Sequence, residues 1–323
     1  MIRRLLLFVM IFSVGITFVN PGSIEKVGEP IQVSPEEEFF MAPKWSPDGK
    51  FLSVTKSKYN GIYLISLVDN SITTITGELG AGYGYQWSKD GKYIVARVSK
   101  YQGRYRYSAL KVYEIPSGRV QQISDYVASV PGVPMWSPDG SFVYLSFTDK
   151  LRIYPVEGIA KATGTQPGEI IYVKKDKIYQ YNFKNKAESE LISLRGEIAH
   201  RKKEVRVINL TVSPDYRKIS FEVIGGPLYT MVLEDKALFE IGQGYRPCWS
   251  PDGNYIVYMV TEDDGHRYTA SDIFISSWDG VDKFQITNTP DKLEMNPSWS
   301  PDGKWIAFDT IDDGHIYIQE IKY

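Results

Sequence analysis

The hexapeptide WSPDGK stands at residues 45–50 and returns unchanged at 299–304. Four variants lie between these two copies: WSKDGK at 87–92, WSPDGS at 136–141, VSPDYR at 212–217 and WSPDGN at 249–254. Successive copies begin 37 to 50 residues apart, except for an interval of 76 residues between the third and the fourth. A period of this length indicates a repeat architecture, and the long interval predicts one repeat that has lost its motif.

The segments around the motif give the content of one repeat. A short apolar run typical of a strand follows each motif, and a seventh such run, EIIYVKK at 169–175, has no motif before it. The next strand carries an aromatic residue near its start: Tyr63, Tyr113, Tyr154, Tyr179, Tyr229, Phe274 and Tyr317. A further short strand ends each repeat, and its seventh copy, PIQVS at 30–34, precedes the first motif. Four strands per repeat of this length are typical of a β-propeller blade.

We therefore predict an all-β, seven-bladed β-propeller over residues 28–323, in which strand 30–34 completes the last blade. Such pairing joins the two ends of the chain and leaves no long sheet edge exposed. Six blades with an inserted hairpin at 165–205 are the alternative. Because Tyr154 and Tyr179 are close in sequence, the fourth blade is expected to have at most a vestigial first strand.

The motif itself is predicted to be structural. In Ser-Pro-Asp-Gly the proline presets φ, the aspartate accepts hydrogen bonds from nearby backbone, and the glycine takes positive φ. The preceding tryptophan is expected to pack between neighbouring blades. Lys89 replaces the proline in one copy, and Val212 and Tyr216 replace the tryptophan and the glycine in another, so these two turns are expected to be the least regular.

Composition excludes several classes of protein. The chain has 37 Lys and Arg against 39 Asp and Glu, a balance that argues against a nucleic-acid binder. Cys248 is the only cysteine, which excludes internal disulfides and a thiolate zinc cluster. The segment 1–22 has two arginines followed by an apolar run from Leu5 to Val19, which predicts a signal peptide or an uncleaved membrane anchor. We therefore expect an exported protein that contacts the membrane through this segment alone, if at all.

The repeated WSPDGK motif resembles the repeats of the TolB-like propellers, a class that includes the periplasmic propeller of the Tol–Pal envelope system. The resemblance covers roughly residues 28–323 and implies the fold. It implies little about function, because similar repeats occur in envelope scaffolds, in peptidase gating domains and in some pectate-fragment lyases. TolB also has an N-terminal α/β domain without a counterpart in this sequence, so the partner contacts of that domain are not carried over.

Strand order predicts which loops share a face of the ring: those joining the second and third strands of a blade and those joining successive blades. All three histidines, His200, His266 and His315, fall in such loops. The last two end the near-identical loops TEDDGH and TIDDGH of adjacent blades. Carboxylates with imidazoles suit Ca²⁺, Mn²⁺ or Zn²⁺, which makes a cation site one interpretation, with these candidate ligands: Asp263, Asp264, Asp312 and Asp313. The alternative is a tight hairpin turn, which Asp and Gly favour.

Two Tyr- and Gly-rich loops, GAGYGYQ at 80–86 and KYQGRYRY at 100–107, are expected on the same face. Tyr and Arg are favoured residues at interfaces, so the loops predict a binding patch. Its candidate residues are Tyr83, Tyr85, Tyr101, Arg104, Tyr105 and Arg106. The alternative is that some of these tyrosines pack between blades.

The sequence contains neither a Gly-x-Ser-x-Gly elbow nor a His-Glu-x-x-His helix. We therefore expect a monomeric, non-catalytic scaffold without a cofactor, which binds an envelope protein, a peptide or a glycan with the histidine-bearing face. The competing hypothesis is a metal-assisted polysaccharide lyase or hydrolase, in which the three histidines converge at the mouth of the channel.

Overall fold

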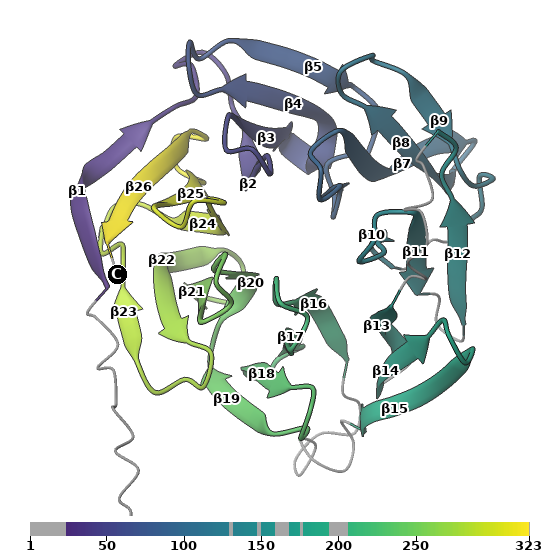
Figure 1. Ribbon diagram of the computed structural model, residues 1–323. Helices are drawn as coiled ribbons and strands as arrows, with labels where there is room; N and C mark the ends of the chain where they lie inside the picture. The colour runs from purple at the N-terminus through teal and green to yellow at the C-terminus, as the bar shows by residue number, and fades with distance from the viewer. Residues whose placement is uncertain are drawn as a thin grey trace, which may run out of the picture.

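The structure is a computed structural model that describes residues 24–128, 132–146, 150–158, 168–174, 177–193 and 206–322. It consists of seven antiparallel sheets arranged in a ring (Figure 1). The predicted seven-bladed propeller is therefore confirmed, and the six-bladed alternative is wrong because the segment 169–193 forms a blade of its own. We number the blades 1 to 7 in chain order of their inner strands.

The first four blades have either four or three described strands. Blades 1 and 2 have four each: β2 (Met41–Trp45), β3 (Phe51–Lys56), β4 (Asn60–Ser66), β5 (Ile72–Thr76), β6 (Gln86–Trp87), β7 (Tyr93–Gln102), β8 (Tyr105–Glu114) and β9 (Val120–Gln122). Blades 3 and 4 have three each: β10 (Met135–Trp136), β11 (Phe142–Ser146), β12 (Leu151–Pro155), β13 (Glu169–Lys174), β14 (Lys177–Asn182) and β15 (Ala187–Ser193). Blade 4 has no first strand among its described residues, as expected, and the strand expected at 159–164 for blade 3 lies outside them.

The last three blades have four strands each. Blades 5 and 6 consist of β16 (Val207–Val212), β17 (Lys218–Val223), β18 (Leu228–Val232), β19 (Leu238–Gly242), β20 (Tyr245–Trp249), β21 (Tyr255–Asp263), β22 (Tyr268–Ser277) and β23 (Lys283–Gln285). Blade 7 combines the two ends of the chain: β24 (Glu294–Trp299), β25 (Trp305–Thr310), β26 (Ile316–Lys322) and β1 (Glu25–Gln32).

The closure of the ring by the N-terminal strand is confirmed. Strand β1 pairs antiparallel with β26, and Figure 1 shows these two strands side by side in the same blade. The strand begins at Glu25, earlier than the expected PIQVS segment, and has an irregularity between Val27 and Ile31. The backbone N–H of Val33 extends the pairing by donating to Ile316 O at 2.9 Å.

The six Ser-x-Asp turns share one hydrogen-bond pattern. In each, the aspartate Oδ1 accepts from the serine hydroxyl at 2.5–2.6 Å and from the backbone N–H two residues later at 3.0–3.2 Å. The expectation of two irregular turns was wrong, because the serine and the aspartate define the geometry. Tyr216 adopts a φ of 57° where the other copies have glycine. The segment SWDG at 277–280 forms the same turn between β22 and β23, with the Ser277 hydroxyl 2.6 Å from Asp279.

Three of the tryptophans before these turns bond to the preceding blade, whereas Trp299 donates to Gly303 O of its own turn. The indole N–H of Trp45 donates to Ser298 O at 3.1 Å, that of Trp87 to Ser53 Oγ at 2.8 Å and that of Trp136 to Gln86 O at 3.2 Å. The apolar clusters likewise combine residues of adjacent sheets, so the core lies between the blades. Among the residues that the structure describes, no helix is long and apolar enough to cross a membrane. The segment predicted as a signal peptide or anchor, 1–22, lies outside the described residues.

Candidate functional site

The loops between second and third strands and between blades form one face of the ring, which we call the histidine-bearing face. Two hairpins on this face, β7–β8 and β21–β22, are longer than the others, with strands of 9 or 10 residues. Figure 1 shows the innermost strands β2, β16, β20 and β24 around the centre of the ring. The site therefore combines the hairpins, the linkers and the wall of the central channel.

The innermost strands of four blades contain a bulge at which one residue adopts φ values of 50–57°. These residues are Ala42, Asn209, Arg246 and Asn296. Two of the bulges donate their backbone N–H to a carboxylate of the preceding blade, namely Ala42 to Asp309 at 2.9 Å and Arg246 to Glu222 at 2.5 Å. Both carboxylates are buried, with 3% of their surface exposed, and link adjacent blades around the channel.

Arginine and tyrosine side chains from three blades meet at the mouth of the channel on this face. Arg246 of blade 6 donates from its guanidinium to the Tyr59 hydroxyl of blade 1 at 3.2 Å. Tyr59 makes an edge-on contact with Tyr83, with ring centroids 5.2 Å apart, and the Arg97 guanidinium of blade 2 lies 5.0 Å from the Tyr83 ring. We call these four residues the mouth cluster. Blade 7 lies between blades 6 and 1 in the ring. The contact between Arg246 and Tyr59 therefore crosses the inside of the ring.

Lys44 of β2 lies near the mouth cluster. Its ammonium donates to Tyr85 O at 2.6 Å and lies 4.8 Å from the centroid of the Tyr85 ring. Burial lowers the pKa of Lys44 to about 8, and the like charge of Arg246 acts in the same direction. Burial raises the pKa of Asp309 to about 7, although hydrogen bonds from Asn296 and the Ala42 N–H and the charge of Arg246 oppose the shift. The channel wall thus combines a buried acid of raised pKa, Asp309, with two cations.

The patch predicted from the Tyr-rich loops is formed in part. Tyr101 and Tyr105 are each 60% exposed near the tip of the β7–β8 hairpin, and Arg104 stacks over the Tyr105 ring at 5.6 Å. Arg106 is exposed but turns back, donating to Ser99 Oγ at 3.0 Å. Tyr83 is half-buried in the mouth cluster.

Tyr85 does not belong to this surface. Its side chain is fully buried between blades 1 and 2, and its hydroxyl donates to Ser53 Oγ at 2.9 Å. The expectation that Tyr85 binds a partner was therefore wrong, because its ring is enclosed between the two blades and its hydroxyl already has a partner inside the protein. Sequence analysis also missed Tyr59, Arg97 and Arg246, which carry no motif, and residue spacing gives no signal for a contact between blades 6 and 1.

The loops TEDDGH and TIDDGH face a common groove of about 790 Å³, lined on one side by residues 263 and 265–269 and on the other by residues 290–293 and 311–312. The first loop is an exposed hairpin turn. Asp263 accepts from the Gly265 N–H at 2.9 Å, and Asp264 accepts from the N–H groups of His266 and Arg267, both at 2.9 Å. His266 is exposed at the tip of the hairpin.

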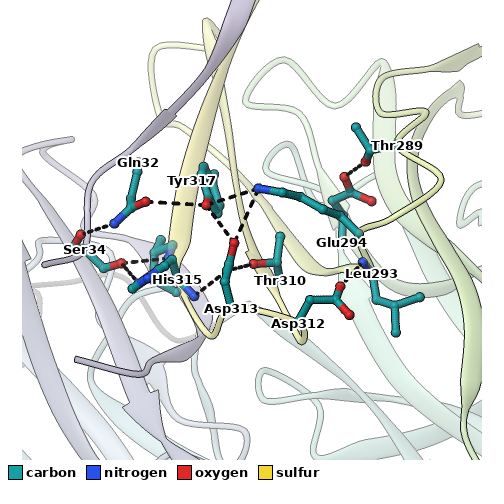
Figure 2. A network of polar contacts seen from close by, with 12 residues as sticks. Gln32, Ser34, Thr289, Leu293, Glu294, Thr310, Asp312, Asp313, His315 and Tyr317 are labelled. Atoms are coloured by element: carbon teal, nitrogen blue, oxygen red, sulfur yellow. Dashed lines mark hydrogen bonds and ion pairs between the residues drawn. The ribbon is translucent and has the colours of Figure 1, made fainter. Parts of the chain in front are cut away.

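The second loop is a structural junction, and Figure 2 shows its contacts. Asp313 accepts hydrogen bonds from Thr310, from the His315 N–H at 3.0 Å and from the Tyr317 hydroxyl at 2.9 Å, and it pairs with Lys292 at 3.4 Å. Asp312 accepts from the Leu293 N–H at 2.6 Å. These bonds attach the loop to the linker before β24.

His315 is buried, with 7% of its surface exposed, and its ring stacks on Phe39 with centroids 6.2 Å apart. Its Nδ1 lies 3.3 Å from the Ser34 hydroxyl of the N-terminal segment. The expectation that His315 contacts a ligand was therefore wrong, because the chain closure covers its ring. His200 lies outside the described residues. Within those ranges no three His, Cys, Asp or Glu side chains are grouped closely enough to hold a metal ion, and the cation site stays a prediction.

Comparisons with known proteins agree on the fold. No protein-family profile and no curated protein sequence matches the chain. TolB from Acinetobacter baumannii is 18% identical with a TM-score of 0.56 over 84% of this chain, which spans 60% of that protein. A putative TolB from Agrobacterium tumefaciens is 20% identical with a TM-score of 0.53, covering 88% of this chain and 90% of the other. The β-propeller domain of Cps50 (Swd1) from Myceliophteria thermophila is 11% identical with a TM-score of 0.60, covering 93% and 100%. The chain thus has the TolB-like propeller fold.

Proposed function

We propose that this protein is an exported, non-catalytic scaffold that binds an envelope protein or a peptide with its histidine-bearing face. The observation that supports this function is the mouth cluster, in which two arginines and two tyrosines from separate blades meet on one surface. Arg and Tyr dominate the energetics of protein interfaces because they combine large contact area with hydrogen bonding. The likeness in fold to the two TolB structures supports a protein partner, and the apolar run of the N-terminal segment supports export.

The β7–β8 hairpin would supply a second contact. Tyr101, Arg104 and Tyr105 are exposed at its tip, and the hairpin belongs to the same blade as Arg97 of the mouth cluster. A partner that inserts a segment at the channel mouth could therefore also rest on the hairpin. Such a surface joins a central anchor to an exposed rim, an arrangement common in interfaces.

The proposal is tested by cross-linking the purified propeller to an envelope extract and mapping the cross-linked sites by mass spectrometry. We expect the Tyr59→Ala/Tyr83→Ala double variant to lose most of the captured partner, since each tyrosine is a large part of the contact area. Val68→Ser and Val281→Ser are matched controls, because both side chains are strongly exposed, at 87% and 77%, in turns of the opposite face. Equal capture by the double variant, or cross-links confined to the face of Val68 and Val281, would refute the proposal.

A further inference from the structure

The wall of the channel contains two cations without a carboxylate partner. Throughout the described part of the chain, no Asp or Glu side chain lies within ion-pair distance of Lys44 or Arg246. The ammonium of Lys44 bonds to a neutral carbonyl, that of Tyr85, and the guanidinium of Arg246 bonds to a neutral hydroxyl, that of Tyr59. Unpaired charges that are partly removed from water are costly, so such a pair is suited to an anionic ligand.

Asp309 and Glu222 interact electrostatically with Arg246 but form no ion pair with it. Asp309 Oδ1 accepts from the Ala42 N–H and from Asn296 Nδ2, both at 2.9 Å, and Glu222 Oε1 accepts from the Arg246 N–H and from Asn209. Both carboxylates are thus fixed by the links between blades. Burial also raises the pKa of each, that of Asp309 to about 7, so Asp309 carries less than a full negative charge near neutral pH.

We propose that Lys44 and Arg246 form an anion site in the channel mouth that binds a carboxylate of a peptide partner. The inference rests on the proposed function and names the chemistry that the mouth cluster would recognise. A guanidinium binds a carboxylate through two parallel hydrogen bonds, and the ammonium adds a point charge beside it. The neighbouring Asp309 and Glu222 disfavour a doubly charged phosphate, which would be repelled more strongly by whatever charge they keep.

The aromatic neighbours favour a peptide as the source of the carboxylate. Tyr59 bonds to Arg246 and contacts the Tyr83 ring, so aromatic surface lies beside this cation, and aromatic residues with arginine are favoured at interfaces. The carboxylate could belong to a chain terminus or to an Asp or Glu side chain. The experiment separates these two sources.

The test uses calorimetric titration with five probes: sodium acetate, sodium glucuronate, free triglycine, N-acetyl-Gly-Glu-Gly amide and N-acetyl-triglycine amide. We expect the probes that carry a carboxylate to bind and the neutral amide not to bind. Preference for free triglycine would assign the site to a chain terminus, and preference for the Glu peptide would assign it to a side chain. Equal binding of the neutral amide, or no binding by any probe, would overturn the anion site, as would tighter binding of glucuronate than of either peptide.

Variants distinguish specific binding at Lys44 and Arg246 from a general attraction of anions to positive charge on the surface. Lys44→Met and Arg246→Gln should each weaken carboxylate binding at least about tenfold, which corresponds to about 1.4 kcal/mol. Lys100→Met is the matched control, since Lys100 is an exposed lysine of the same face that lies 3.9 Å from the Tyr126 ring. Lys44→Arg should retain binding and guards against a folding defect in Lys44→Met. Unchanged binding in folded Lys44→Met would overturn the inference.

The pH dependence gives an independent readout. Because burial and the charge of Arg246 lower the pKa of Lys44 to about 8, against the opposing effect of the neighbouring Cys248, Lys44 should lose most of its positive charge between pH 7 and pH 9 and the site should bind carboxylates more weakly. The loss should be absent in Lys44→Arg, and a loss of equal size in that variant would overturn the assignment to Lys44. The two proposals can fail separately. If Tyr59→Ala/Tyr83→Ala loses the envelope partner while Lys44→Met keeps carboxylate binding, the proposed function is supported and the anion site is overturned.

Discussion

The loops 261–266 and 310–315 have nearly the same sequence, TEDDGH and TIDDGH, and occupy the same position in adjacent blades. Their contacts and their exposure to solvent nevertheless differ. In the first, the carboxylates of Asp263 and Asp264 accept hydrogen bonds from backbone N–H groups of their own turn, and the loop is exposed. In the second, Asp313 accepts from Tyr317 and pairs with Lys292, while His315 is buried beneath Phe39.

The difference comes from what lies beside each loop. The hairpin of blade 6 extends beyond the sheet into solvent, whereas the hairpin of blade 7 meets the N-terminal segment that closes the ring. Ser34 of that segment accepts a hydrogen bond from the Ile316 N–H at 3.0 Å, and the Phe40 N–H donates to Gly314 O at 2.8 Å. Nearly the same turn sequence therefore has a structural role where the N-terminal segment meets the hairpin of blade 7. Five measurements can test this contrast between the two loops.

The largest effect is expected from removing the partner of the second loop. Deleting residues 24–34 removes β1 and the contacts of Ser34, and it exposes the edge of β26 along its length. Loss of a whole strand with its buried Ile24 and Val33 should cost more than about 3 kcal/mol and lower the cooperativity of unfolding. Urea unfolding followed by circular dichroism measures this cost. A midpoint equal to that of the intact protein would contradict the closure.

A smaller effect is expected from the paired carboxylates. Asp313→Ala leaves Thr310, Tyr317 and Lys292 without their acceptor and should cost about 2–3 kcal/mol. Asp264→Ala removes an acceptor that water can replace, so its unfolding midpoint should stay close to that of the wild type. Both values come from the same urea series. Equal costs for the two variants would mean that the second loop is an ordinary exposed turn.

Glycine substitutions give the cleanest matched pair. Gly265 and Gly314 both have positive φ, at 86° and 70°, so alanine introduces similar backbone strain at each. A Cβ on Gly265 meets no atom within 4 Å, whereas one on Gly314 would lie 2.5 Å from Phe39 Cδ1. Gly314→Ala should therefore cost about 1 kcal/mol more than Gly265→Ala, because Phe39 must leave its place over His315. The difference between their melting temperatures tests this expectation, and Phe39→Ala should abolish it.

Acid should affect the two loops unequally. Burial raises the pKa of Asp313, but hydrogen bonds from Thr310, the His315 N–H and Tyr317, with the charge of Lys292, outweigh it and hold the pKa below its usual value. A lowered pKa adds stability that is complete above the pKa of the unfolded chain, near 4, and is lost as the pH falls through the folded value. Asp313→Asn should therefore flatten the fall in stability between pH 4 and pH 2. Asp264→Asn should change this slope less, because the Asp264 carboxylate is exposed and screened.

The fold could be predicted from the sequence because most blades repeat the same local pattern of turn residues and apolar strands. Ser and Asp of each turn bond to one another and to the turn backbone, and these bonds form even where Tyr216 replaces the glycine. Alternation and turn residues are local signals, so strand order and the closing strand followed from them. The lengths of the hairpins β7–β8 and β21–β22 could not be predicted, because nothing in the apolar runs shows where each strand extends beyond the sheet.

The candidate site was predicted less well, because it depends on contacts between distant blades. Arg246 and Tyr59 are 187 residues apart, and each is an unremarkable polar residue in its own repeat. Tyr85 was placed on the surface because its neighbours Tyr83 and Gly84 are loop residues, whereas its side chain faces Ser53 of the preceding blade. His315 and His266 share a sequence context, and what separates them is a chain end that lies far away in sequence.

The smallest effect is expected from divalent cations. Asp263 of the first loop and Asp312 of the second line one groove, and their mutual repulsion would be relieved by a bound ion. The oxygens of the four loop carboxylates, however, already accept hydrogen bonds from backbone N–H groups and from Tyr317, which leaves few lone pairs directed at a common point. We therefore expect the melting temperature to change by less than about one degree between chelator and millimolar Ca²⁺, Mn²⁺ or Zn²⁺. A rise with cation concentration that disappears in His266→Ala would instead establish the metal site and make the exposed loop the functional member of the pair.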